Sequence, residues 1–256
     1  MKRQGKIIRR MGYVRDQEGI MNRYLREKAN WEIHLQKTRQ FIKDSFQDPL
    51  IESVAVLGSG WLLDVPLEEL QERFKHVYLV DINHPVQIRK KTSAMEKVEL
   101  IEADLSGGAI NQLWQLSRSK SKPLQGTLSD QFSLQNPLTD ISPDAVISVN
   151  LLNQLDIIMC DFMAKHDYFQ QEQPKLFRST IQLFHLQWIT STPGCLVSDV
   201  MEVNEDKKGN KTSKSLLYTD LPQGIRRDSW TWEFDSRGTY HSNTLTSMEV
   251  NAVEWA

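Results

Sequence analysis

The chain of 256 residues is poor in cysteine, in long apolar runs and in net charge. Its two cysteines, Cys160 and Cys195, stand far apart without CxxC or Cys/His spacing, so neither a disulfide framework nor a metal site is expected. No apolar run reaches the roughly eighteen residues that cross a bilayer, and no apolar segment of a secretion signal follows the N-terminus. These absences predict a soluble cytoplasmic protein that does not bind membranes.

The formal net charge of -2 and the sequence pI near 6.3 give no reason to expect general affinity for nucleic acid. The first fifteen residues are an exception, because they contain six cations and no acid: Lys2, Lys6, Arg3, Arg9, Arg10 and Arg15. We expect a solvated, partly frayed end, with contact to an anionic partner as the alternative. Nothing in the sequence indicates the oligomeric state.

The length fits one large α/β domain with appendages. Residues 1–50 are expected to form an N-terminal helical cap and residues 51–256 the main domain. In the cap, apolar positions at helical spacing predict one long helix, or two broken near Asn30: Ile20, Tyr24, Trp31, Leu35, Ile42 and Phe46. Tyr24, Arg26 and Trp31 are candidates for a lid, and the alternative is that Tyr24 and Trp31 are core anchors.

Beyond the cap, strands and helices alternate. Strands are predicted at Ser53–Leu57, His76–Val80, Val98–Leu105, Asp144–Leu152 and Cys195–Val203. Helices are predicted from Asp64-Val65-Pro66 with Asp64 as the N-cap, from Pro85 to about Met95, over Ala109–Ser117 and over Pro174–Thr190. Residues 118–143 read as a surface excursion, and 156–173 give no clear pattern. Alternating residues at Ser229–Phe234 and Met248–Trp255, with a hairpin tip at Lys208-Gly209-Asn210, predict late antiparallel strands.

Polar and glycine residues follow the first four strands. Gly58-Ser59-Gly60 comes directly after the first strand, and a turn of this kind lets backbone N–H groups face a ligand without Cβ obstruction. Asp81 closes the second strand, where an acid can accept hydrogen bonds from ribose hydroxyls, and Asp104 and Asn150 close the third and fourth. Parallel strands end at one edge of a sheet, so these residues predict a nucleotide-type site there.

Together these residues resemble a class I S-adenosylmethionine-dependent methyltransferase, from about Val54 to the C-terminus. The resemblance implies a Rossmann-like, mostly parallel seven-stranded sheet with an antiparallel C-terminal strand, S-adenosylmethionine as cofactor and in-line transfer of its methyl group. By this analogy Gly58, Ser59 and Gly60 lie beside the methionine part and Asp81 holds the ribose. Ile82 packs on the adenine, Asp104 and Leu105 meet its edge, and Asn150 belongs to the fourth-strand motif.

The match departs from the family pattern at two positions of the glycine turn. Val56 stands where an acid is usual, and Leu62 stands where a third glycine is usual, so the amino-acid end of the cofactor is expected to be held differently. Tyr24, Asn153 and Gln154 are candidates for contact with the methyl acceptor. The acceptor and any catalytic base are not indicated.

Two other functions stay open at this point. Gly58-x-Gly60 followed by Asp81 also resembles the fingerprint of a nicotinamide-dependent oxidoreductase, although the third glycine and a second nucleotide-binding half are missing. A non-catalytic cofactor-binding or scaffold protein that kept the fold is the third possibility, for which the absence of an acid at Val56 is the main support.

Overall fold

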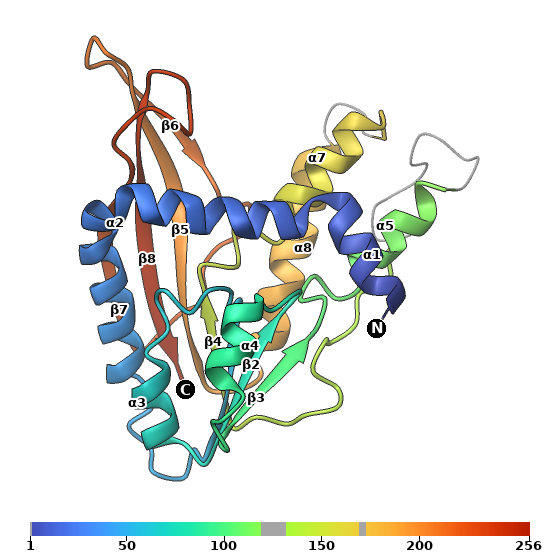
Figure 1. Ribbon diagram of the computed structural model, residues 1–256, viewed down its shortest axis with the longest axis vertical. Coiled ribbons are helices and arrows are strands. Elements are labelled where there is room, and N and C mark those ends of the chain that lie inside the picture. The colour runs from blue at the N-terminus through green and yellow to red at the C-terminus, as the bar shows by residue number, and fades with distance from the viewer. Residues whose placement is uncertain (1, 119–131, 169–172) are drawn as a thin grey trace.

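A computed structural model describes residues 2–118, 132–168 and 173–256 (Figure 1). In these residues one sheet of eight strands has the order β3-β2-β1-β4-β5-β8-β7, with β6 paired to β5. The strands are β1 (Ser53–Leu57), β2 (His76–Asp81), β3 (Val98–Glu102), β4 (Ala145–Val149), β5 (Gly194–Glu205), β6 (Lys211–Ser215), β7 (Arg226–Asp235) and β8 (Leu245–Trp255). The helices are α1 (Lys2–Met11), α2 (Tyr13–Asp44), α3 (Leu67–Arg73), α4 (Val86–Thr92), α5 (Ala109–Leu116), α7 (Ile157–Lys165) and α8 (Gln173–Ile189).

The first five strands are parallel to one another, as expected from their apolar runs. β1 pairs with β2 and β4, β2 with β3, and β4 with β5. Every residue of β4 is buried, as are all but the first of β1, because helices cover both faces of this half of the sheet. The carboxyl ends of these strands therefore meet at one edge.

The C-terminal strands are antiparallel, which confirms the expectation for this part of the chain. β8 lies between β5 and β7 and runs antiparallel to both. Among the described residues the sheet has one strand more than the expected seven, because the hairpin at Gly209 adds β6 to β5. The predicted hairpin tip is thus correct, and the segment after it is long enough to pair with β5 as strand β6.

Two apolar layers pack on opposite faces of the sheet. One joins α3, α4 and the second half of α2 to the sheet, and it includes Trp31, Leu67 and Trp232. The other joins α5, α7 and α8 to the opposite face, and it includes Leu113 and Phe177. The segment 156–173, which gave no clear pattern, contains α7, and part of the predicted 118–143 excursion lies outside the described residues.

The N-terminal segment forms two helices that cross the carboxyl edge of the sheet. Figure 1 shows α2 running above the arrowheads of β2 and β3 and then turning down beside β7. α2 is one continuous helix, which settles the choice between one helix and two. The expectation of a frayed basic end is wrong, because α1 is helical and buries Ile7, Ile8 and Met11 against its neighbours. No described helix combines the length and the hydrophobicity that a membrane span requires.

Candidate cofactor and substrate cavity

A cavity of about 310 Å³ lies at the carboxyl edge of the parallel strands, beneath α2. It brings together almost all of the predicted site residues, from the segments that follow four strands: Gly58, Ser59, Gly60, Asp81, Ile82, Asp104, Leu105, Asn150, Asn153 and Gln154. The walls are completed by α2 and by aromatic residues of β7 and the loop after it. The cavity is of the size and position typical of small-molecule sites in α/β proteins.

The glycine turn has a backbone conformation that explains its residues. Gly58 and Gly60 have φ angles of 80° and 44°, in the left-handed region. A Cβ on Gly58 would lie 3.0 Å from the Val149 carbonyl oxygen, so β1 and β4 approach closely only because this residue is glycine. Leu62 also has a positive φ of 56°. The backbone at this position is therefore left-handed although the residue is not glycine.

Asp81 is fixed against the glycine turn. Its Oδ2 accepts a hydrogen bond of 2.8 Å from the Gly60 N–H, which links the end of β2 to the turn after β1. Burial raises the pKa of Asp81, and the hydrogen bond from Gly60 acts in the opposite direction. One carboxylate oxygen thus holds the loop, and Oδ1 has only a long contact of 3.4 Å with the Asn83 N–H.

Asp104 has a structural role at the start of α5. Its carboxylate accepts hydrogen bonds from the backbone N–H groups of Ser106, at 3.0 Å, and Ile110, at 3.2 Å. Burial raises its pKa and these hydrogen bonds lower it. Its contact with an adenine ring, and that of the neighbouring Leu105, stays a prediction.

Asp64 does not cap α3. The helix begins only at Leu67 with Pro66 before it, and no side chain caps its N-terminus. Asp64 instead lines the cavity, where its Oδ2 accepts a hydrogen bond of 2.6 Å from the Asn150 side chain. Burial raises the pKa of Asp64, and the hydrogen bond from Asn150 lowers it. Asp64 was predicted to be an N-cap because Pro66 follows two residues later and proline is common in the first turn of a helix. The sequence pattern does not distinguish such a cap from a carboxylate that faces a cavity.

His34 of α2 lies between Asn150 and the sheet. Its Nδ1 accepts a 3.0 Å hydrogen bond from the Trp230 indole N–H, and its Nε2 is 3.3 Å from the Asn150 amide nitrogen. Burial lowers the pKa of His34 to about 3, so the ring is neutral and carries its proton on Nε2. Two N–H donors therefore face each other at the contact with Asn150, which is not a hydrogen bond. The ring also stacks on Trp232, at 4.0 Å between centroids. The Asn150 amide is oriented by its hydrogen bond to Asp64.

Asp199 is a cavity acid with little hydrogen bonding. Its side chain is buried on β5, its Oδ2 has a long contact of 3.4 Å with the Asn153 amide, and its Oδ1 has no hydrogen-bond partner. Burial, reinforced by the nearby charge of Asp64 and opposed by the hydrogen bond from Asn153, raises the pKa of Asp199 to about 7. Sequence reasoning missed this residue, although an acid within the apolar run CLVSDV of a buried strand is a usable signal.

The raised pKa makes a testable prediction about stability. Between about pH 4 and pH 7 the folded state keeps a proton on Asp199 that the unfolded chain has released. The contribution of this carboxyl to the free energy of unfolding is therefore fully present below about pH 4 and is lost as the pH rises through about 7. We expect Asp199→Asn to unfold like the wild type at pH 4 and to be more stable than it at pH 8. Urea denaturation at both pH values measures the difference. A difference that does not change with pH would contradict the assignment.

The acceptor candidates separate into two groups. Asn153 and Gln154 line the cavity as predicted. Tyr24 is not among the residues that line it and lies half-buried beside the Trp31 ring, at 5.9 Å between centroids, so its contact with the acceptor stays a prediction. Tyr24 shares the apolar face of α2 with Ile20 and Trp31, which do line the cavity.

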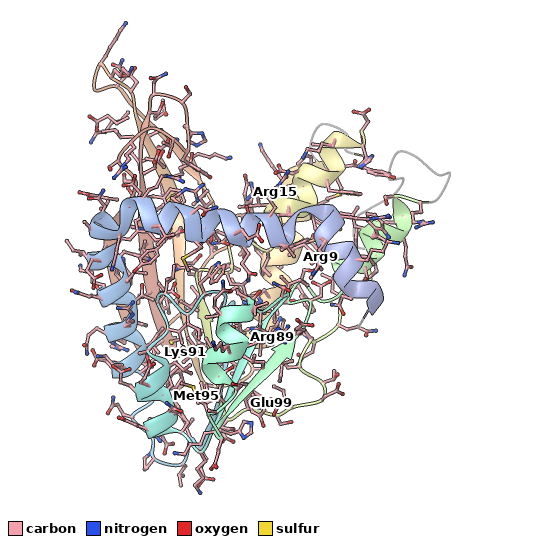
Figure 2. All side chains as sticks on the ribbon, viewed as in Figure 1. Arg9, Arg15, Arg89, Lys91, Met95 and Glu99 are labelled. Carbon is pink, nitrogen blue, oxygen red and sulfur yellow. The ribbon has the colours of Figure 1, made fainter. Side chains whose placement is uncertain are left out.

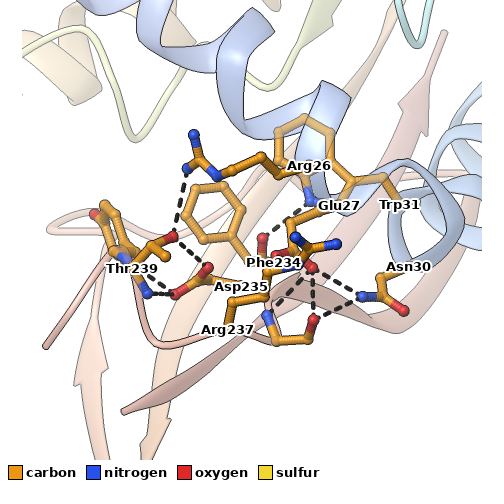
Figure 3. Close-up of polar contacts among 10 residues, drawn as sticks. Arg26, Glu27, Asn30, Trp31, Phe234, Asp235, Arg237 and Thr239 are labelled. Atoms are coloured by element: carbon orange, nitrogen blue, oxygen red, sulfur yellow. Dashed lines mark hydrogen bonds and ion pairs between the residues drawn. The ribbon is translucent and has the colours of Figure 1, made fainter. Parts of the chain in front are cut away.

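Figure 3 shows how α2 is fastened to the loop between β7 and β8. The Trp31 indole N–H donates to the Phe234 carbonyl oxygen at 3.0 Å, and the buried Glu27 accepts a 2.7 Å hydrogen bond from the Ser236 hydroxyl. The Asp235 carboxylate in turn accepts hydrogen bonds from the backbone N–H groups of Thr239, at 2.6 Å, and Tyr240, at 2.8 Å. These two hydrogen bonds hold the loop in a closed turn. Arg26, a lid candidate, is exposed and reaches the Thr239 hydroxyl at 3.4 Å.

The chain matches no protein-family description and no curated protein. Among solved structures, ErmE, a 23S rRNA methyltransferase, is 10% identical over 86% of this chain and 68% of its own, with a TM-score of 0.33. DhpI, solved with SAH, is 10% identical over 93% of this chain and 95% of its own, with a TM-score of 0.37. A Pyrococcus horikoshii protein to which RNA methyltransferase activity has been ascribed is 12% identical over 80% of this chain and 77% of its own, with a TM-score of 0.32.

Proposed function

We propose that this protein is a class I S-adenosylmethionine-dependent methyltransferase whose cofactor binds in the cavity at the carboxyl edge. The observation that carries the proposal is the hydrogen bond between Gly60 and Asp81, which joins the glycine turn to the strand-end acid inside that cavity, and we propose this acid as the one that holds the ribose. The sheet supports it, because five parallel strands are followed by an antiparallel one inserted beside β5, as the resemblance implies.

The cavity residues fit the parts of this cofactor. Asp81 Oδ1 would accept from the ribose hydroxyls, with Ile82 against the adenine and Asp104 with Leu105 at its edge. The turn from Gly58 to Gly60 would lie beside the methionine part. Ser59 Oγ and Asn150 Oδ1 are buried cavity atoms without a hydrogen-bond partner, as expected where a polar ligand supplies one.

Asp64 would replace the acid that is missing at Val56. A carboxylate that is buried and oriented by Asn150 is suited to the ammonium group of the cofactor's amino-acid end. The cofactor supplies an electrophilic methyl group on a sulfonium. The residues of the chain then have to hold the acceptor in line and exclude water, and Trp31 and Trp61, from α2 and the glycine turn, line the cavity for that purpose.

A nicotinamide dinucleotide fits this cavity less well. Such cofactors place their pyrophosphate at the start of the helix that follows the glycine turn. Here α3 begins seven residues after Gly60, and the Asp64 carboxylate stands in the intervening segment, where it would repel a phosphate. A purely structural scaffold is also less well supported, because a buried polar atom without a partner, such as Ser59 Oγ, destabilises the fold unless a ligand forms a hydrogen bond with it.

Replacing Asp81 with asparagine should weaken binding of S-adenosylhomocysteine by roughly 1.5–3 kcal/mol, because a charged acceptor for the ribose hydroxyls is lost. Isothermal titration calorimetry with S-adenosylmethionine, S-adenosylhomocysteine and NAD measures this. Asp144→Asn is the matched control, since Asp144 caps the opposite, amino-terminal start of β1 through Ser53. Equal affinities in wild type and Asp81→Asn would refute the ribose contact, and binding of NAD alone would refute the methyltransferase.

The proposed compartment is the cytoplasm. Cys160 and Cys195 are both free thiols, and a reducing environment keeps such residues unpaired.

A further inference from the structure

The cavity is strongly acidic. Among the described residues that line it, a single arginine, Arg23, carries a positive charge. Six of them carry a carboxyl group: Asp16, Asp64, Asp81, Asp104, Asp199 and Glu202. His34 is neutral because burial lowers its pKa to about 3. No three His, Cys, Asp or Glu side chains of the described chain come together in a way that could hold a metal ion. The field inside the cavity therefore favours an organic cation and opposes a phosphate.

The basic residues lie elsewhere. Figure 2 shows Arg9 and Arg15 on the N-terminal helices and Arg89 and Lys91 on α4, all on the outside of the molecule. The α4 pair is already engaged, because Arg89 contacts Glu102 and Lys91 lies 2.8 Å from Glu68. None of these four residues lines the cavity, so an anionic group inside it would meet a single cation, Arg23, among the described lining residues. A small cationic acceptor suits this lining.

The two acids on β5 stand next to the aromatic strands. Glu202 pairs with Met248 of β8, which pairs with Trp232 of β7, so a carboxylate and an indole lie in one row across three strands. Asp199 lies on the other side of the bulge in β5. Asp64, in contrast, belongs to the segment after the glycine turn. The acids of the cavity thus divide between the proposed cofactor end and an end formed by β5 and β7.

This second end has unpartnered acceptors. Asn153 Oδ1 and Asp199 Oδ1 are buried there without a hydrogen-bond partner, and the Trp232 indole N–H is an unpartnered donor at the same end. A ligand that satisfies the two oxygens must donate, as an ammonium group does with up to three N–H bonds. One cation already lies on the aromatic wall, because the Arg23 guanidinium packs against the rings of Phe234, at 4.6 Å, and Tyr240, at 4.8 Å.

We infer that the methyl acceptor is a small amine with an apolar body, bound as its ammonium ion by Asp199 and Glu202 against Trp232 and Tyr240. The inference rests on the proposed function and names its substrate class. The Asp199 carboxylate takes one proton from the ammonium, which frees the nitrogen lone pair. That pair forms the new N–C bond as the S–C bond of the sulfonium breaks, leaving a thioether and a methylated ammonium product.

The burial of Asp199 supports this role. A pKa of about 7 lets the group exchange a proton near neutral pH, as a general base must. Asp64 raises the pKa of Asp199 through its charge, so the proposed cofactor end and the acceptor end are electrostatically linked. Glu202, which accepts a 2.9 Å hydrogen bond from His241, would supply the second carboxylate.

The test compares matched ligands by calorimetry, with and without saturating S-adenosylhomocysteine. Phenethylamine should bind at least about tenfold more tightly than the neutral 2-phenylethanol and the anionic phenylacetate. Asp199→Asn and Glu202→Gln should each remove most of this preference and leave S-adenosylhomocysteine affinity unchanged. Asp64→Asn should weaken the binding of S-adenosylhomocysteine and keep the preference for the amine. Glu249→Gln, an exposed position on the adjacent strand β8, is the control that should change neither.

Three results would overturn the inference. One is equal affinity for the amine and the alcohol in the wild type. Another is a loss of S-adenosylhomocysteine affinity in Asp199→Asn that matches any loss of amine affinity, which would assign this acid to the cofactor. The third is displacement of the amine by a short RNA oligonucleotide. Failure of S-adenosylhomocysteine to bind the wild type would refute the proposed function itself, and titration of the amine alone tells the two failures apart.

Discussion

Replacing Arg178 with methionine is expected to lower the free energy of unfolding by about 3–5 kcal/mol at pH 7. Arg178 on α8 donates from Nε to Asp156 Oδ1 at 2.6 Å, and the Asp156 side chain is completely buried. Methionine keeps much of the volume but leaves the carboxylate with only the neutral amide of Gln182, at 2.8 Å. A buried charge without its counter-ion is costly because water no longer solvates it.

This loss should depend on pH. Burial raises the pKa of Asp156, and the charge of Arg178 acts against it. Without the arginine the pKa rises further, so the variant loses additional stability as the pH increases from about 4 through its new, higher pKa. The difference from the wild type should therefore be smaller at pH 5 than at pH 7, as measured by urea denaturation.

The control for Arg178→Met is Lys75→Met. Lys75 forms an ion pair with Glu52 in which both side chains are more than half exposed, and such pairs contribute about 0–1 kcal/mol. A deficit in Arg178→Met that is no larger than that of Lys75→Met, or that is equal at both pH values, would show that the buried pair does not stabilise the fold in this way.

Replacing Trp31 with alanine is expected to lower the free energy of unfolding by about 3–5 kcal/mol as well, through a cavity in the core. Trp31 is 2% exposed and contacts the Trp232 ring edge-on at 4.7 Å and the Phe234 ring at 5.7 Å. Its loss also leaves the Phe234 carbonyl without the indole donor. Chemical denaturation measures the effect.

Leu25→Ala in the same helix is the control for Trp31→Ala, because Leu25 is 65% exposed and its truncation should cost within about 0.5 kcal/mol. Trp31→Phe separates packing from hydrogen bonding, since it keeps most of the ring and loses only the donor. Full stability of Trp31→Ala would mean that α2 and β7 do not share a core.

The core of the fold could be predicted because its signals are local. β1 and α8 were predicted within one residue at each end, from an unbroken apolar run and from a helical repeat closed by Pro193-Gly194. The glycine turn and the strand-end acids were found because spacing along the chain fixes where they fall on a parallel sheet.

The apolar members of the buried face of α2 were predicted correctly, among them Trp31 and Leu35, but its polar members were not. Glu27, His34 and Thr38 are buried on this helix, and the first two accept hydrogen bonds from β7 and the loop after it. A hydrophobic repeat does not record partners that lie about two hundred residues away in the sequence. Asp64 was misplaced for the same reason, since its partner Asn150 comes from another strand.

Leu62 has a wider consequence. It is 9% exposed, belongs to the apolar core and holds a left-handed backbone that glycine would adopt without strain. The surrounding packing thus enforces a torsion that glycine usually permits. Replacing Leu62 with glycine would therefore relieve this torsion and at the same time leave a void in the core, two effects that oppose each other in the free energy of unfolding.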